Sequence, residues 1–170
     1  MLARNETIFK WALYAAGAAL CLLVQGSLLQ RITLLGVIPF LPPLLAAIPA
    51  TYESPFAGSV YALCMGVLCD QLLPGPIPCF YTLVFPLAGL LASLISKSLL
   101  PAGFLCALAV SVLAFLLTDL FHCLLLAIGG KAAWGAGFSV LARETLVTLP
   151  LAIPVTALFR AIHRRTHLND

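Results

Sequence analysis

Long apolar runs, separated by only a few residues, are the feature that most limits what this chain can fold into. Hydrophobic residues make up 62% of the 170 positions and charged residues only 9%, whereas a soluble domain carries roughly 25% charged residues. A chain of this length cannot hide so much apolar surface from water, so its surroundings must largely be lipid. The runs do not alternate with a period of two, which favours helices over a closed barrel. We therefore expect an all-α polytopic membrane protein.

The apolar runs predict a compact bundle of about six transmembrane helices, forming a single integral membrane domain over residues 1–170. The predicted spans are residues 11–29, 32–51, 55–73, 79–100, 103–128 and 137–159. Prolines interrupt the second span, at Pro39, Pro42, Pro43 and Pro49. Because proline removes a backbone donor and clashes with the preceding turn, we expect this span to be a broken helix packed against protein. Whether it crosses the membrane completely is left open by the sequence.

The cysteines and the polar residues form no pattern typical of a metal site, a disulfide framework or an enzyme. Most of the six cysteines lie inside apolar runs, where a thiol behaves as a small hydrophobe. No C-x-x-C pair or Cys/His cluster with zinc spacing is present. The chain also lacks a Ser-His-Asp or Cys-His set, an H-E-x-x-H motif and a P-loop. We therefore expect no metal, no cofactor and no enzymatic activity.

The net charge of +3 is distributed in a way that indicates membrane topology rather than a nucleic-acid partner. If both termini are cytoplasmic, the inner side holds Arg4, Lys10, Lys97, Arg160, Arg164 and Arg165. The outer side then holds only Arg31 and Lys131. The excess of positive residues on cytoplasmic loops therefore favours cytoplasmic termini. Residues 160–170 are predicted to form a basic cytoplasmic tail.

Charged side chains inside apolar spans are costly and usually face protein or water. Those in or beside the predicted spans are Glu53, Asp70, Asp119, Arg143 and Glu144, with His122 nearby. With cytoplasmic termini, four of these charged residues fall in the outer half of the bilayer: Asp70, Asp119, Arg143 and Glu144. Arginine is long enough to reach a carboxylate one turn away in depth, so we predict that Arg143 pairs with Asp70 or Asp119. The cluster is interpreted first as an ion pair that fixes helix order, and alternatively as a contact with a partner or ligand. A third interpretation, an intramembrane enzyme, requires Asp119, His122 and Glu144 to converge on one cavity.

Small residues at helical spacing predict that the spans pack closely in a compact bundle. Gly58 and Gly66 are eight positions apart, which places them on nearly one face of a helix. Gly89 belongs to a small face on the next span, and Pro150 and Pro154 predict a kink in the sixth. Small residues let helix backbones approach closely in lipid.

These residues together resemble the MreD family of rod shape-determining membrane proteins. The matching stretch covers about 40 residues: Gly58, then Gly66-Val-Leu-Cys-Asp70, then a turn with Gly75, then an apolar span with Tyr81 and Gly89. In that family the pattern is Gly…Gly-x-x-x-Asp, followed by a turn glycine and another apolar helix. The rest of the chain is similar to the family only in hydropathy and in its number of spans.

The resemblance implies a non-enzymatic inner-membrane scaffold of the bacterial cell-elongation machinery, which directs peptidoglycan synthesis and rod shape. Such a protein would bind a bitopic MreC-type partner. Through that partner it would be linked indirectly to the MreB filament, to the RodA glycosyltransferase and to its transpeptidase. In this interpretation Asp70 and its glycines shape the surface of span three, and Arg143 helps to hold it.

A second interpretation is a substrate-binding membrane subunit of an energy-coupling-factor vitamin transporter, which is also small, apolar and six-span. Those proteins use small residues on the first span for coupling, and this chain has Ala12, Ala15, Ala16 and Ala19 there. A vitamin site needs a polar and aromatic pocket near the outer face. The residues available to line one are Asp70, Asp119, Trp134 and Arg143.

Overall fold

Helices form nearly all of the computed structural model, which describes residues 2–130 and 134–167. The α-helices are α1 (Leu2–Ser27), α2 (Pro42–Ala50), α3 (Pro55–Leu72), α4 (Phe80–Ser98), α5 (Phe104–Ile128), α6 (Trp134–Thr148) and α7 (Ala152–His167). Two short 3-10 turns, η1 (Leu29–Arg31) and η2 (Leu149–Leu151), follow α1 and α6. Five helical stretches among these residues are long and apolar enough to cross a membrane. The predicted all-α, multi-pass architecture is therefore confirmed.

The final predicted span is two helices rather than one. Pro150 lies in η2, between α6 and α7, and Pro154 lies in the first turn of α7. A proline inside a helix removes a hydrogen bond, whereas one in the first turn does not. Pro150 therefore ends the α-helix at η2, and Pro154 is compatible with the start of α7. In the same region, residues 160–167 of the predicted basic tail form the last turns of α7. Residues 168–170 of that tail and the predicted outer charge Lys131 lie outside the described residues.

The proline-rich second segment is broken as predicted, and its exposed backbone groups are satisfied by other helices. Its only α-helix, α2, has nine residues and is buried along its whole length. Ahead of it, the Gln25 side chain donates to the Pro39 carbonyl at 2.9 Å and accepts from the Leu41 N–H at 3.0 Å. The Phe40 N–H donates to the Thr148 hydroxyl at 3.1 Å. Irregular backbone is tolerated at membrane depth only where protein supplies such partners.

This segment returns along most of α1, from Ser27 back to the level of Lys10. Glu53 Oε1 lies 2.6 Å from Lys10 Nζ, although the chain between them first runs to the far end of α1 at Ser27. The part of α1 from Lys10 to Ser27 corresponds to roughly 26 Å at ~1.5 Å per residue, close to the ~30 Å hydrocarbon thickness of a bilayer. The segment therefore has the reach of a full crossing, half extended and half helical.

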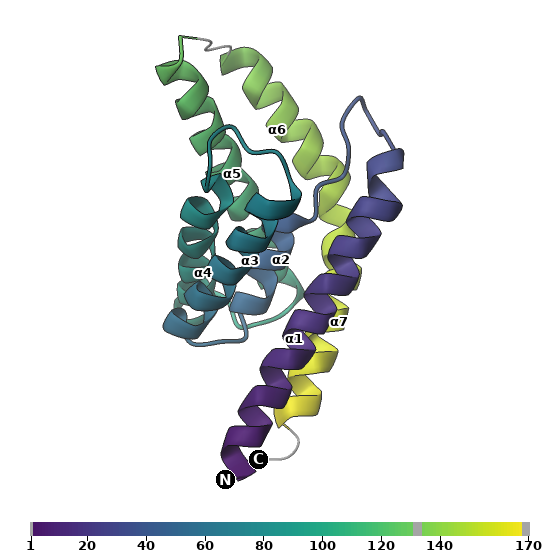
Figure 1. Cartoon of the computed structure of the whole chain (residues 1–170), viewed down its shortest axis with the longest axis vertical. Coiled ribbons are helices and arrows are strands. Elements are labelled where there is room, and N and C mark those ends of the chain that lie inside the picture. Colours follow the sequence, from purple (N-terminus) through teal and green to yellow (C-terminus); the bar gives the residue numbers. More distant parts are fainter. Residues whose placement is uncertain (1, 131–133, 168–170) are drawn as a thin grey trace.

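The helices form two groups that meet at α2 (Figure 1). α3 and α4 form a tightly packed antiparallel hairpin, which α2 and α5 cover, while α1 pairs mainly with α7. α6 packs against α5 and continues through η2 into α7. The start of α1 and the end of α7 lie at the same end of the molecule (Figure 1). The Lys10–Glu53 pair lies toward this end, and the α3–α4 turn lies at the opposite end.

Candidate functional site

Asp70, near the end of α3, caps the first turn of the neighbouring helix α4. Its Oδ1 accepts from the Tyr81 N–H at 3.0 Å, and its Oδ2 accepts from the Thr82 N–H at 2.8 Å and the Thr82 hydroxyl at 2.5 Å. The residue that precedes α4, Cys79, has a φ of 61° and provides no side-chain cap. The first N–H groups of a helix have no partner within it. Asp70 therefore supplies, from another helix, the cap that α4 lacks locally.

The predicted ion pair of Arg143 is wrong. Within the described ranges the one salt bridge joins Lys10 to Glu53, and the Arg143 side chain is exposed. Both carboxylate oxygens of Asp70 are instead occupied by α4. Equal depth in the membrane brought Asp70 and Arg143 together in the prediction. Two side chains at one depth meet only if their helices turn those faces toward each other, and depth does not determine that rotation.

Tyr81 is the motif residue that lies beside Asp70. Its N–H donates to Asp70 Oδ1 at 3.0 Å, and its ring centroid lies 5.2 Å from those of Phe80 and Phe85. Asp119 on α5 and Glu144 on α6, the other carboxylates of the predicted cluster, form no salt bridge within the described residues. The sequence assigned Tyr81 no role beyond its place in the motif. The sequence signal that could have identified Tyr81 is its position in the first turn of the helix that follows the interhelical loop. That loop brings the chain back beside Asp70.

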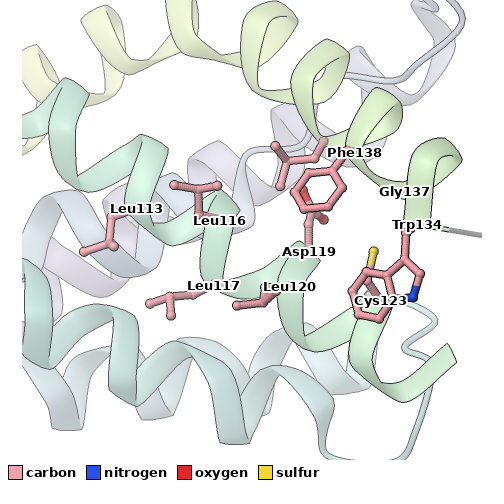
Figure 2. A pocket seen from close by; sticks show the side chains of 10 residues that line it. Leu113, Leu116, Leu117, Asp119, Leu120, Cys123, Trp134, Gly137 and Phe138 are labelled. Carbon is pink, nitrogen blue, oxygen red and sulfur yellow. The ribbon is translucent and has the colours of Figure 1, made fainter. Parts of the chain in front are cut away.

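Asp119 lines a cavity of about 300 Å³ between α5 and α6 (Figure 2). The other lining residues are apolar or aromatic, apart from the thiol of Cys123, and they include Trp134 and Phe138. One buried Asp119 oxygen has no hydrogen-bond partner among the described residues. His122 points elsewhere, with its ring edge-on to Phe80 at a centroid distance of 6.0 Å. In the part of the chain that the structure covers, no three His, Cys, Asp or Glu side chains are placed to hold a metal ion.

The predicted packing glycines lie where α3 and α4 touch. A Cβ on Gly66 would lie 2.6 Å from the Tyr81 carbonyl oxygen, and one on Gly89 would lie 2.9 Å from the Gly58 carbonyl oxygen. Both contacts are with backbone, which cannot move aside cheaply. Gly75 is in the α3–α4 turn, where a Cβ would meet the Ile77 carbonyl oxygen at 3.2 Å. The glycines thus set the distance between the two helices and hold Asp70 beside the start of α4.

A second cavity, which we call the α1–α3 groove, runs along the outside of the bundle. It has a volume of about 820 Å³ and apolar walls. Its α1 side extends from Trp11 to Leu23 and its α3 side from Val60 to Leu72, so each wall is roughly 18 Å long at ~1.5 Å per residue. Small residues of α1 line it: Ala15, Ala18 and Ala19.

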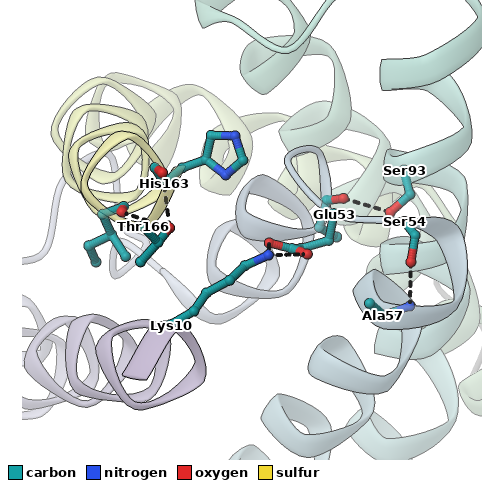
Figure 3. A network of polar contacts seen from close by, with 9 residues as sticks. Lys10, Glu53, Ser54, Ala57, Ser93, His163 and Thr166 are labelled. Carbon is teal, nitrogen blue, oxygen red and sulfur yellow. Dashed lines mark hydrogen bonds and ion pairs between the residues drawn. The ribbon is translucent and has the colours of Figure 1, made fainter. Parts of the chain in front are cut away.

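Aromatic rings and an ion pair hold α1 to the rest of the bundle below this groove. The Tyr14 ring lies 5.9 Å from that of Tyr61 on α3 and 5.8 Å from that of Phe159 on α7, between centroids. Lys10 Nζ lies 2.6 Å and 2.8 Å from the two Glu53 oxygens, with side-chain exposures of 20% and 9% (Figure 3). The sequence presented Lys10 and Glu53 only as separate charges. Their shared location at one end of the predicted bundle is the signal that could have linked them.

Breaking the Lys10–Glu53 pair from one side is expected to destabilise the protein by about 2–4 kcal/mol, since the remaining charge is left mostly buried. Glu53→Leu and Lys10→Met should each show this loss in unfolding titrations in mixed micelles. The double variant should recover most of it, because no unpaired charge remains. Additive losses in the double variant would contradict a direct pairing.

No protein-family model, no curated protein and no solved structure matches this chain. The described residues present several features with functional potential, among them the capped α3–α4 hairpin, the apolar α1–α3 groove and the cavity beside Asp119. Any function must therefore be argued from these features and from the motif in the sequence.

Proposed function

We propose that this protein is a non-enzymatic scaffold of the bacterial cell-elongation machinery, similar in role to MreD proteins. One observation carries the proposal. The residues that match the MreD motif are those that build the α3–α4 hairpin: Gly66 and Gly89 bring the helices into contact, and Asp70 caps α4. The motif thus corresponds to one structural unit rather than to scattered apolar positions. Its residues hold the surface of the hairpin together, which is the role of a scaffold.

In this proposal the protein lies in the bacterial inner membrane with both termini in the cytoplasm. The basic side chains support this orientation. Lys10 and Lys97 lie toward the end of the molecule where α7 ends with Arg164 and Arg165, whereas Arg31 lies near the other end of α1. Positive residues favour the cytoplasmic side.

The partner is a bitopic MreC-type protein, and its single transmembrane helix occupies the α1–α3 groove. The groove is about as long as three turns of helix and is lined by alanines, which allow close approach of a second backbone. Its walls carry no charge, which suits an apolar partner helix. Through this partner the protein is linked indirectly to MreB, RodA and the RodA transpeptidase.

Affinity purification from native membranes in a mild detergent tests the proposal. The expected result is co-elution of an MreC-like bitopic protein together with cell-wall synthases. Ala19→Leu should reduce that recovery roughly tenfold, because it fills the groove. Ala109→Leu, on the exposed side of α5, is the matched control and should change nothing. Equal recovery with both variants would place the partner elsewhere on the protein.

The α5–α6 cavity favours a second candidate, the vitamin-binding subunit of an energy-coupling-factor transporter. Asp119 and Trp134 both line the cavity, as that alternative requires, and its volume is at the lower limit of typical ligand pockets. Asp70 and Arg143 do not line it. Recovery of paired ATPases with a coupling subunit, in place of a bitopic protein, would favour this candidate.

A further inference from the structure

A third cavity, of about 430 Å³, opens between the start of α5 and the outer side of α7. Its lining combines Arg160, Arg164 and the hydroxyl-bearing Thr156 with four apolar side chains: Phe104, Ile153, Ala157 and Ala161. Arg160 and Arg164 are one turn apart, which places them on the same face of α7. Ile153 and Ala157 continue that face away from the arginines, toward the middle of the bundle.

The positive charges of Arg160 and Arg164 are available to a ligand. Across the described part of the chain neither forms a salt bridge, and both side chains are exposed. Glu53, an acidic residue toward this end of the fold, is already held by Lys10. Among the described residues, no acidic side chain therefore neutralises the charge of the pair.

The apolar part of the cavity has the orientation that an acyl chain needs. Ile153 and Arg164 are separated by roughly 16 Å along α7 at ~1.5 Å per residue. The arginines are near the end of the helix and the apolar residues lie deeper. A ligand that fills this space must carry a negative head and a hydrocarbon tail, in that order along the membrane normal.

We propose that this cavity binds one anionic phospholipid, whose phosphate is held by Arg160 and Arg164 and whose acyl chain lies against Ile153 and Ala157. Guanidinium groups bind phosphate oxygens through charge-assisted hydrogen bonds. Basic pockets between helices on the cytoplasmic side are the sites where anionic lipid heads bind. Arg160 and Arg164 lie at the end of the molecule that carries most of its basic residues. The inference needs that orientation but does not depend on any protein partner.

Native mass spectrometry of the full-length, delipidated protein tests this inference. We expect one phosphatidylglycerol to bind at least tenfold more tightly than phosphatidylcholine with the same acyl chains. Arg160→Gln/Arg164→Gln should abolish the preference. Arg165→Gln removes a charge from the same helix outside the cavity, so the preference should remain. An equal loss with Arg165→Gln, or equal binding of the two lipids by the unaltered protein, would overturn the site.

Two further measurements separate a lipid from a simple phosphate site. Ala157→Phe fills the apolar part and keeps both arginines, so it should also weaken phosphatidylglycerol binding several-fold. Inorganic phosphate at the same concentration should not displace the lipid, because it lacks the chain. Displacement by phosphate, or full binding by Ala157→Phe, would contradict the lipid assignment. Unchanged melting temperatures of the variants establish that they are folded.

Discussion

Replacing Gly66 with alanine is expected to lower the stability of the protein by about 2–3 kcal/mol. The new methyl group would lie 2.6 Å from the Tyr81 carbonyl oxygen and 2.8 Å from Thr82 Cα. Since both atoms belong to the backbone of α4, the helices must move apart. That movement also lengthens the hydrogen bonds from α4 to Asp70, so packing and capping are lost together. Unfolding titrations of the purified protein in mixed micelles measure the change.

Gly26→Ala is the matched control for this experiment. Gly26 is also in a helix, but a Cβ there would have no atom within 4 Å. Alanine is the better helix former by about 1 kcal/mol, so this variant should be as stable as the parent or slightly more stable. A similar loss of stability in both variants would mean that the effect comes from the helix backbone rather than from the α3–α4 contact.

Replacing Asp70 with alanine is expected to have the other large effect, a loss of about 2–4 kcal/mol. The carboxylate accepts hydrogen bonds from the Tyr81 N–H, the Thr82 N–H and the Thr82 hydroxyl. The loss of one hydrogen bond to a charged group costs about 1.5–3 kcal/mol of stability. Loss of an N-cap alone costs about 0.5–2 kcal/mol. Asp70→Asn keeps one acceptor oxygen and should fall between alanine and the parent. The same unfolding titration ranks the three proteins.

Arg143→Leu distinguishes this cap from the ion pair that the sequence suggested. The Arg143 side chain is exposed and forms no salt bridge within the described residues, so its replacement should change stability by no more than about 0.5 kcal/mol. If Arg143→Leu proved as damaging as Asp70→Ala, the arginine would have to hold the aspartate after all.

Much of the secondary structure could be predicted because it depends on local properties. Apolar runs and the prolines that bound them placed α3, α4 and α5 within two residues of their observed ends. The glycine spacing identified the contact face of α3 for the same reason, since helical periodicity is a property of the chain itself. The split between α6 and α7 was visible only as a kink at Pro150, because a proline marks a weak point without stating how far the chain turns there.

The candidate site was predictable only in part. Asp70 was correctly singled out as a polar anchor in an apolar helix, but its partners are backbone groups of the next helix, which no residue type reveals. The Lys10–Glu53 pair and the Gln25 contacts with residues 39–41 join segments that hydropathy treats as independent. In each case the missing information was the rotation of one helix relative to another.

The sequence by itself determined that the chain is helical and multi-pass, which segments are apolar enough to cross a membrane, and that its second segment is broken by prolines. These properties follow from burial in lipid and from backbone chemistry, which act residue by residue. Only the tertiary structure decided that Asp70 caps α4, that Glu53 reaches Lys10 and that Arg143 stays exposed. Such pairings depend on how side chains pack between helices, and packing selects rotations that composition and spacing leave undetermined.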